Sequence, residues 1–161
     1  MIYTYLETPI GMLLIAGDEE AVRRIEFPKN GKAARPEADW RESSRGPVAE
    51  AVRQLGEYFA GKREQFDLPL APAGTEFQRG VWRRLQEIPY GGTISYGELA
   101  KRVGNPKASR AVGAANGQNP IPIVIPCHRV IGANGKLTGF GGGLPIKEAL
   151  LALEAKPAAC K

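Results

Sequence analysis

The chain has 161 residues, enough for one ordinary domain or for two small lobes that share a core. Hydrophobic residues make up 43% and charged residues 24%, which is the composition of a folded globular protein and not of a disordered or fibrous one. No apolar stretch approaches the length that crosses a bilayer, and the N-terminus lacks the basic and apolar regions of a signal peptide. We therefore expect a cytoplasmic protein without membrane association.

The formal net charge of +5 is distributed unevenly along the chain. Residues 1–74 hold 10 Lys or Arg against 12 Asp or Glu, whereas residues 75–156 hold 11 against 5. A basic region of this kind is an electrostatic footprint for polyanions such as nucleic acid. At this magnitude an ordinary basic surface explains the charge equally well.

The first half of the chain has the pattern of a β-meander followed by one helix. Short runs rich in aliphatic, aromatic and β-branched residues alternate with turn residues, and a polar segment then reads as a loop. Pro47 suits the start of a helix whose apolar residues recur at helical spacing, and Gly61 suits its end. The expected strands cover residues 2–6, 12–16 and 22–27, the loop covers 28–46, and a linker covers 68–74.

The second half is predicted to be mainly helical. Thr75 and Gln78 have the spacing of a capping box, and the apolar face that follows runs to Ile88 before Pro89 stops the helix. Ser95 begins a second helix in the same way, Gly104 ends it, and a third helix is expected over residues 107–115. Two short helices joined by a tight turn are typical of a helix-turn-helix, although a packed helical hairpin fits the pattern alone better.

The third predicted helix is lined with small residues, and this improves the nucleic-acid interpretation. Ala111 and Gly113 belong to this small-residue face, and Arg110 is the one long side chain in its middle. Small residues let a helix approach a nucleic-acid backbone closely, while one long cation can reach into a groove or the base stack. Lys107, with Lys101 and Arg102, can contact phosphates.

The chemistry-bearing stretch is NPIPIVIPCHRVIG, residues 119–132, which holds the only histidine and one of the two cysteines. Its Ile/Val run, bounded by prolines, is expected to form a short buried strand that ends at Cys127. Two cysteines and one histidine far apart in the sequence argue against a structural zinc site, and without a secretory signal Cys127 and Cys160 are expected to be free thiols.

Cys127 is either a small buried hydrophobe or a nucleophile. His128 and Arg129 adjoin it and are expected to favour its thiolate. Glu154, on the apolar face of the last predicted helix, is the candidate that orients His128, although a frayed, solvated position is an alternative. Because strand neighbours point to opposite faces, His128 reaches the sulfur only through a backbone turn or a water. A Cys-His-Glu hydrolase fits these three residues equally well.

Three segments together carry a family resemblance: NPKASRAVGAANGQNP, PIPIVIPCHRVIG and GFGGG. They closely resemble the O6-alkylguanine-DNA alkyltransferases of bacteria and archaea, nearly continuously over residues 75–154 and more loosely before them. The resemblance implies an α+β fold with an N-terminal α/β lobe at residues 1–70, a DNA-binding and catalytic domain at 75–156 and a flexible tail at 157–161. The second domain is mainly helical and contains the helix-turn-helix and the active-site cysteine segment.

The implied activity is direct repair of double-stranded DNA by a monomer that needs no cofactor and no metal. Cys127 matches the acceptor, which takes the alkyl group from guanine O6 in a single turnover, as a methylated-DNA–protein-cysteine methyltransferase does. His128 matches the base that acts through a water, and Glu154 matches the acid that polarises it. Asn119 matches the residue that ties the turn together.

The resemblance also implies roles in binding the damaged base. Tyr96 matches the tyrosine that donates a hydrogen bond or proton to the departing guanine. Arg110 matches the finger that fills the base stack after the damaged nucleotide is flipped out, with the second helix of the pair docked in the minor groove. Backbone groups of Val130, Phe140 and Gly141 are expected to line the guanine pocket. Because Phe140 and Gly141 replace a tyrosine and a serine of some relatives, that pocket is expected to be roomier.

Two further interpretations stay open beside the hydrolase. A lesion sensor of the alkyltransferase-like type shares the fold but lacks the acceptor cysteine, which is present here. A DNA-binding regulator that senses alkylation through the same thiol usually carries another domain, for which 161 residues leave little room.

Overall fold

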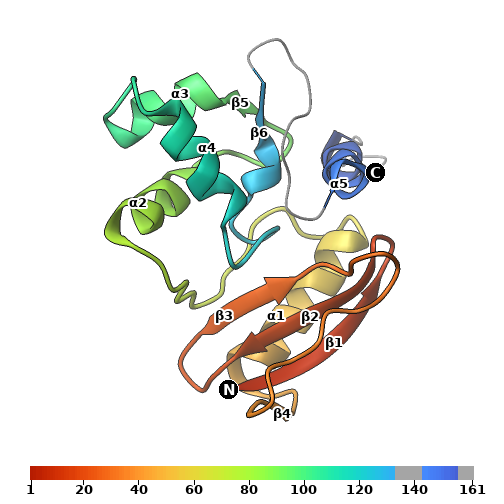
Figure 1. The fold of residues 1–161 in the computed structure, drawn as a ribbon. Coiled ribbons are helices and arrows are strands. Elements are labelled where there is room, and N and C mark those ends of the chain that lie inside the picture. Colours follow the sequence, from red (N-terminus) through yellow and green to blue (C-terminus); the bar gives the residue numbers. More distant parts are fainter. Residues whose placement is uncertain (133–142, 156–161) are drawn as a thin grey trace. The chain divides into compact units, whose positions relative to one another are not determined.

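The computed structural model describes residues 1–132 and 143–155 (Figure 1). The chain divides into two compact units, Met1–Pro72 and Ala73–Lys161. Within the described residues no helix is long and apolar enough to cross a membrane. The first unit is mixed α/β and the second is mainly helical, which confirms the α+β fold class.

The first unit is built on a four-stranded sheet. Its strands are β1 (Ile2–Thr8), β2 (Gly11–Gly17), β3 (Val22–Glu26) and β4 (Arg41–Glu42), in the order β3-β2-β1-β4. The first three form the predicted antiparallel meander. β4 runs parallel to β1 inside the segment that was expected to be a loop. Two backbone hydrogen bonds hold β4, from Arg41 N to Met1 O at 3.0 Å and from Ser43 N to Tyr3 O at 2.9 Å. Because these bonds involve no side chains, the residue pattern of the sequence does not predict this strand.

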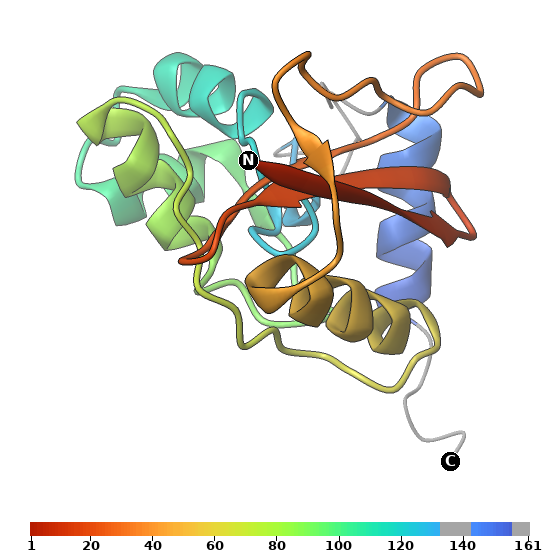
Figure 2. The same ribbon diagram turned by 90° about the horizontal axis from the view of Figure 1, so that it is seen from below.

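Helix α1 (Gly46–Phe59) packs against this sheet, as Figure 2 shows. Val48, Leu55 and Tyr58 are fully buried on its apolar face. Pro47 stands in the first turn and Gly61 follows the end with a φ of +76°, a conformation that glycine adopts without strain. Both predicted helix signals are therefore confirmed.

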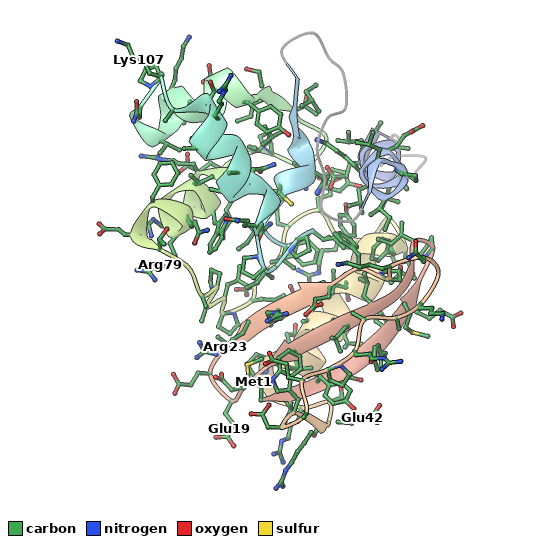
Figure 3. All side chains as sticks on the ribbon, viewed as in Figure 1. Met1, Glu19, Arg23, Glu42, Arg79 and Lys107 are labelled. Carbon is green, nitrogen blue, oxygen red and sulfur yellow. The ribbon has the colours of Figure 1, made fainter. Side chains whose placement is uncertain are left out.

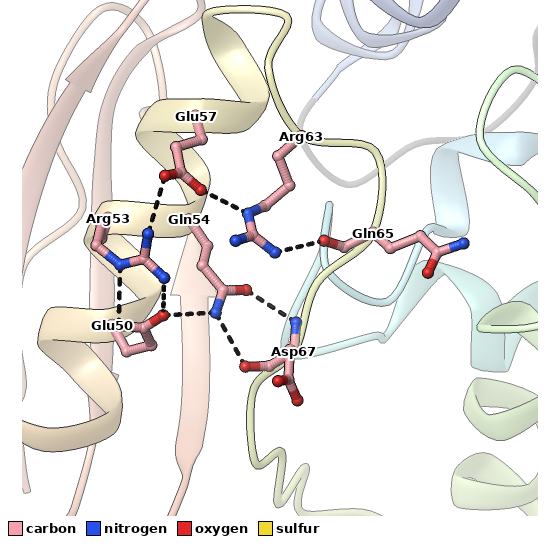
Figure 4. Close-up of polar contacts among 7 residues, drawn as sticks. All are labelled: Glu50, Arg53, Gln54, Glu57, Arg63, Gln65 and Asp67. Atoms are coloured by element: carbon pink, nitrogen blue, oxygen red, sulfur yellow. Dashed lines mark hydrogen bonds and ion pairs between the residues drawn. The ribbon is translucent and has the colours of Figure 1, made fainter.

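A polar network ties the segment after α1 back to the helix (Figure 4). Gln54 is buried, and its side-chain amide donates to Asp67 O at 2.9 Å and accepts from Asp67 N at 2.8 Å. Glu57 accepts from Arg53 and Arg63, at 2.9 and 2.7 Å. Because the amide of Gln54 meets both backbone groups of Asp67, this segment is held without regular secondary structure.

The second unit contains four α-helices among its described residues. They are α2 (Glu76–Leu85), α3 (Tyr96–Val103), α4 (Ser109–Gly117) and α5 (Leu144–Ala155). Both bonds of the Thr75–Gln78 capping box form. Ser95 accepts from Glu98 N at 3.0 Å, but the Glu98 carboxylate pairs with Arg102 and does not complete a second box.

Two features of α2 differ from the sequence expectation, its end and the exposure of one residue. α2 ends at Leu85 and not at Pro89, although Ile88 stays buried in the turn that follows. Phe77, which has the spacing of the apolar face that Val81, Trp82 and Leu85 form, is 39% exposed. Hydrophobic spacing marks the buried side of a segment, but it does not distinguish a helical turn from the bends that follow it.

The helix-turn-helix pair α3–α4 packs on α2. Trp82 of α2 is buried, and its indole N–H donates to Ala115 O of α4 at 2.8 Å. Gly104 begins the turn between α3 and α4 with a φ of +93°. The structure thus contains the predicted pair of helices, with α2 as the support of both.

The prediction of a strand over the Ile/Val run is wrong. The segment 121–126 is buried but irregular, and Ile123 has a φ of +74°. Pro120, Pro122 and Pro126 have no backbone N–H to give to a sheet ladder, so the apolar run folds into successive turns. It leads into a 3₁₀ turn, η1 (Cys127–Arg129), and then into β6 (Val130–Ile131).

Candidate active site

Two asparagine side chains hold the turns that present Cys127. Asn119 Nδ2 donates to Ile125 O at 2.7 Å, and its Oδ1 accepts from Ile121 N at 3.0 Å. Asn116 of α4 is buried, and its Nδ2 lies 3.3 Å from Cys127 O. Asn119 was predicted to tie this turn together, whereas Asn116 received no role. The sequence does hold a signal for Asn116, because its spacing puts this polar residue on the same, buried side of α4 as Val112 and Ala115.

Cys127 is a buried free thiol, 5% exposed. Burial raises its pKa to about 11, while a hydrogen bond with Asn119 and the charge of Lys147 oppose that shift. The expectation that His128 and Arg129 favour a resting thiolate is therefore wrong. Both side chains are directed to Glu154 instead. The thiol is protonated at neutral pH, so it needs a base when it reacts.

His128, Arg129 and Glu154 form a buried polar cluster. Glu154 Oε2 lies 2.7 Å from His128 Nε2, and Arg129 makes two contacts with the same carboxylate, at 2.8 and 3.0 Å. Arg129 also donates to Ile88 O at 2.7 Å. Glu154 is 4% exposed at the end of α5, so the frayed alternative is excluded.

The contacts of Glu154 determine the tautomer of His128. A carboxylate paired with a guanidinium accepts hydrogen bonds and donates none, so Nε2 of His128 must be the protonated nitrogen. Burial lowers the pKa of His128, and the bond to Glu154 opposes this shift. The ring is therefore neutral, with a lone pair on Nδ1, which has no hydrogen-bond partner among the described residues. That lone pair is a base in the interior of the protein.

A short parallel ladder brings Tyr96 and Val130 to the same region. β5 (Ile94–Ser95) pairs with β6, Ile94 opposite Val130 and Ser95 opposite Ile131. Tyr96 follows β5 directly as the first residue of α3. Val130 is buried three residues after Cys127. The ladder therefore links the start of the helix-turn-helix to the cysteine turn.

Helix α4 has one exposed side with small residues. Arg110, Ala111 and Ala114 are exposed, while Val112, Ala115 and Asn116 are buried on the opposite side. Gly113 is half-buried, and a Cβ added there would lie 3.7 Å from the Tyr96 ring. Lys107, at the α3–α4 turn, projects away from the helices (Figure 3). Of the predicted DNA-contact residues, Arg110, Ala111 and Lys107 are thus exposed, whereas Gly113 is half-buried.

Two predicted pocket residues, Phe140 and Gly141, lie outside the described residues. In residues 1–132 and 143–155 no group of three His, Cys, Asp or Glu side chains could hold a metal ion. Every other predicted site residue lies among the described residues: in α3, in the turn between α3 and α4, in α4, in the segment from α4 through η1 to β6, or in α5.

Comparison with known proteins identifies the family. Residues 76–156 match the 6-O-methylguanine DNA methyltransferase DNA-binding domain, and residues 1–72 match the ribonuclease-like domain of the same family. The chain belongs to the 6-O-methylguanine DNA methyltransferase family. The resemblance noted from the cysteine segment is confirmed.

Relatives of this methyltransferase cover nearly the whole chain. It is 58% identical over 154 residues to a methylated-DNA–protein-cysteine methyltransferase of Methanosarcina acetivorans, covering 96% of this chain and 98% of the relative. It is 50% identical to the Haemophilus influenzae protein of the same name, over 96% and 87% of the two chains. The crystal structure of Mycobacterium tuberculosis OGT in complex with DNA superposes with a TM-score of 0.89 at 46% identity, covering 96% and 93%.

Proposed function

We propose that this methyltransferase repairs double-stranded DNA by moving an alkyl group from guanine O6 to Sγ of Cys127, once per protein molecule. The observation that carries the proposal is the buried thiol on the same turn as a neutral His128 whose Nδ1 lone pair is available as a base. The family membership and the DNA complex of the Mycobacterium tuberculosis relative support duplex DNA as the partner. Residues 75–156 would carry both DNA binding and catalysis.

The first proposed step brings the damaged base to the thiol. A guanine O6 atom inside a duplex is out of reach of a buried sulfur, so the nucleotide has to leave the base stack. The exposed small-residue side of α4 suits close approach to the minor groove, and Arg110 is long enough to occupy the space that the nucleotide leaves. Lys107 would contact phosphate, and Val130, Phe140 and Gly141 would line the base pocket.

The second step is the transfer. The thiol proton passes to His128 Nδ1 through a water, and Glu154 stabilises the imidazolium that forms. The sulfur attacks the sp³ carbon in line, the new S–C bond forms, and the C–O6 bond breaks with its electron pair on the guanine. Tyr96 donates a proton to the guanine. The proton held by His128 is then returned to the Tyr96 oxygen. The products are unmodified guanine and a thioether.

The thioether formed on Cys127 is not readily hydrolysed, so each protein molecule would react once. This separates the proposal from a Cys-His-Glu hydrolase, which would release product and turn over.

The test is intact-protein and peptide mass spectrometry after incubation with excess duplex carrying one O6-methylguanine. We expect one added methylene on Cys127, an equal amount of restored guanine and no second turnover. Cys160→Ser should react like the parent and Cys127→Ser should not react. An unmodified Cys127 in protein that binds the duplex would favour the lesion sensor, and repeated turnover would favour the hydrolase.

A further inference from the structure

Two buried side-chain atoms have no hydrogen-bond partner among residues 1–132 and 143–155. They are Oδ1 of Asn116 and Nδ1 of His128. Both residues are almost completely buried, with exposed fractions of 2% and 0%. A buried polar atom without a hydrogen bond is costly, so native interiors seldom keep one unless a bound water or a functional role accounts for it. The proposed transfer uses Nδ1 of His128, but it gives no role to Oδ1 of Asn116.

The orientation of the Asn116 amide follows from its contact with the cysteine turn. Nδ2 lies 3.3 Å from Cys127 O, and the same carbonyl accepts the backbone N–H of Val130. A carbonyl oxygen only accepts hydrogen bonds, so the amide nitrogen has to face it. Oδ1 therefore faces away from this carbonyl as an unused acceptor. Because the amide is planar, the acceptor is held close to the turn that carries Cys127 and His128.

The lone pair of His128 is a second acceptor beside the same turn. Nδ1 is the ring nitrogen nearer the backbone, and Nε2, on the far side of the ring, donates to Glu154 at 2.7 Å. The proposed transfer places a water between the Cys127 thiol and Nδ1. Such a water accepts the S–H hydrogen and donates one of its own hydrogens to Nδ1. Its second hydrogen needs another acceptor.

The neighbouring backbone carbonyls already accept other hydrogen bonds. Ile125 O, Pro126 O and Val130 O accept from a side-chain amide, a backbone N–H and an ammonium. Within the part of the chain that the structure describes, Oδ1 of Asn116 is the buried side-chain oxygen without a donor. A buried water typically makes about three hydrogen bonds to groups that would otherwise be unsatisfied. The thiol, Nδ1 and Oδ1 together supply one donor and two acceptors, a set that one water satisfies.

We propose that Asn116 is a positioning residue of the alkyl transfer, whose Oδ1 atom fixes the water that carries the proton from Cys127 Sγ to His128 Nδ1. The proposal deepens the proposed function and rests on it. The thiol proton passes to the water oxygen as one water proton passes to Nδ1, so the water is regenerated. The other water hydrogen stays directed at Oδ1, and no covalent bond of Asn116 forms or breaks.

The first test observes Nδ1 without DNA. The chain has a single histidine, so labelling histidine with nitrogen-15 in untagged protein gives one imidazole spectrum. A ring nitrogen with a lone pair resonates at lower frequency when it accepts a hydrogen bond. We expect a hydrogen-bonded Nδ1 in the parent and a shift to higher frequency in Asn116→Leu. Asn116→Met removes the same polar atoms with a different shape, and it should give the same shift.

Val112→Ala is the matched control for this test. Val112 is buried one turn before Asn116 on the same side of α4, so its truncation removes packing and leaves the acceptor in place. We expect the Nδ1 resonance of this variant to stay at the parent position. Thermal unfolding would identify which apolar variant of Asn116 is folded under the assay conditions.

The second test measures the transfer itself. Single-turnover rates with increasing concentrations of duplex carrying one O6-methylguanine separate the rate constant at saturation from the half-saturating concentration. We expect Asn116→Leu to lower the rate constant about tenfold, the size of effect that one lost hydrogen bond in the transition state produces. The half-saturating concentration should not change, because Asn116 is proposed to act on the proton and not on the duplex.

A free lone pair on Nδ1 in the parent would overturn the inference without any variant. So would a resonance that is the same in the parent and in a folded apolar variant. Slower transfer with that unchanged resonance would show that Asn116 acts only by holding the Cys127 carbonyl, and it would overturn the inference as well. If the parent accepts no methyl group from O6-methylguanine, the proposed function fails, whereas a shift of Nδ1 without DNA still places the water beside Asn116.

Discussion

His128 shows how burial determines a protonation state at the scale of one residue. Its ordinary pKa lies near neutrality, and an adjacent carboxylate would raise that pKa in water. Here desolvation is the larger influence and Glu154 the smaller, so the pKa is lowered. The carboxylate still orients the ring, at 2.7 Å from Nε2, and leaves the lone pair on Nδ1.

The lowered pKa of His128 predicts that stability is lost as the pH falls. Below the ordinary pKa of about 6.5, His128 binds a proton in the unfolded chain but not in the folded chain. The free energy of unfolding therefore falls by up to about 1.4 kcal/mol for each pH unit of acidification. The chain has a single histidine, so this slope between about pH 7 and 5 belongs to His128.

The measurement is denaturant unfolding across this pH range, followed by Trp82 fluorescence in a Trp40→Phe background. The slope should disappear in His128→Asn. A slope of the same size in that variant would contradict the assignment to His128, and stability that rises on acidification would contradict the direction of the shift.

Arg129 and Glu154 show a second effect of residue-scale burial. Two charges inside a protein are costly unless they are paired with good geometry, and removing one partner is more costly still. The guanidinium meets the carboxylate at 2.8 and 3.0 Å and also donates to the backbone of Ile88. Arg129 therefore holds Glu154 in place beside His128.

At the scale of elements, the turn of the helix-turn-helix depends on one glycine. Gly104 ends α3 with a φ of +93°, and a Cβ at this position would meet no atom within 4 Å. The requirement for glycine is therefore conformational and not steric, because L-residues with side chains are strained at this φ.

Replacing Gly104 with alanine should destabilise the second unit by about 1 kcal/mol, because alanine is strained in the left-handed conformation. Gly117→Ala is the matched control. It lies at the last residue of α4, its φ is not positive, and a Cβ there also meets no atom within 4 Å. Denaturant unfolding of the two variants should show a loss for Gly104→Ala alone. Equal effects would show that φ at Gly104 does not decide the cost.

At the scale of the whole molecule, charge is divided between the units. The first 74 residues carry an acidic excess, 12 against 10, and residues 75–156 a basic excess, 11 against 5. Protein–DNA affinity depends on salt because bound phosphates release counterions. The salt dependence should therefore come from the second unit.

Lys107→Ala should lower the slope of log affinity against log salt concentration by about one. Lys62→Ala, an exposed lysine of the first unit, should leave the slope unchanged. Fluorescence anisotropy with an undamaged duplex at several salt concentrations measures both slopes. A larger change for Lys62→Ala than for Lys107→Ala would place the DNA-binding surface in the first unit and contradict the proposal.

The sequence by itself determined the elements whose signals are local. The meander, the capping box at Thr75 and the helix ends at Gly61 and Gly104 depend on neighbours within a few residues, so they could be predicted. The segment PCHRV indicated the family, and Cys127, His128 and Glu154 were named as candidates for the same site.

Only the tertiary structure decided how those candidates meet and which charges they carry. The apolar run before Cys127 forms turns and not a strand, because its prolines lack N–H donors and Asn119 binds the carbonyl of Ile125 within it, while Asn116 binds the carbonyl of Cys127 at its end. The burial of Lys147 and the raised pKa of Cys127 depend on desolvation by elements distant in the chain. Desolvation is a property of the packed interior, and no spacing of residues along a sequence encodes it.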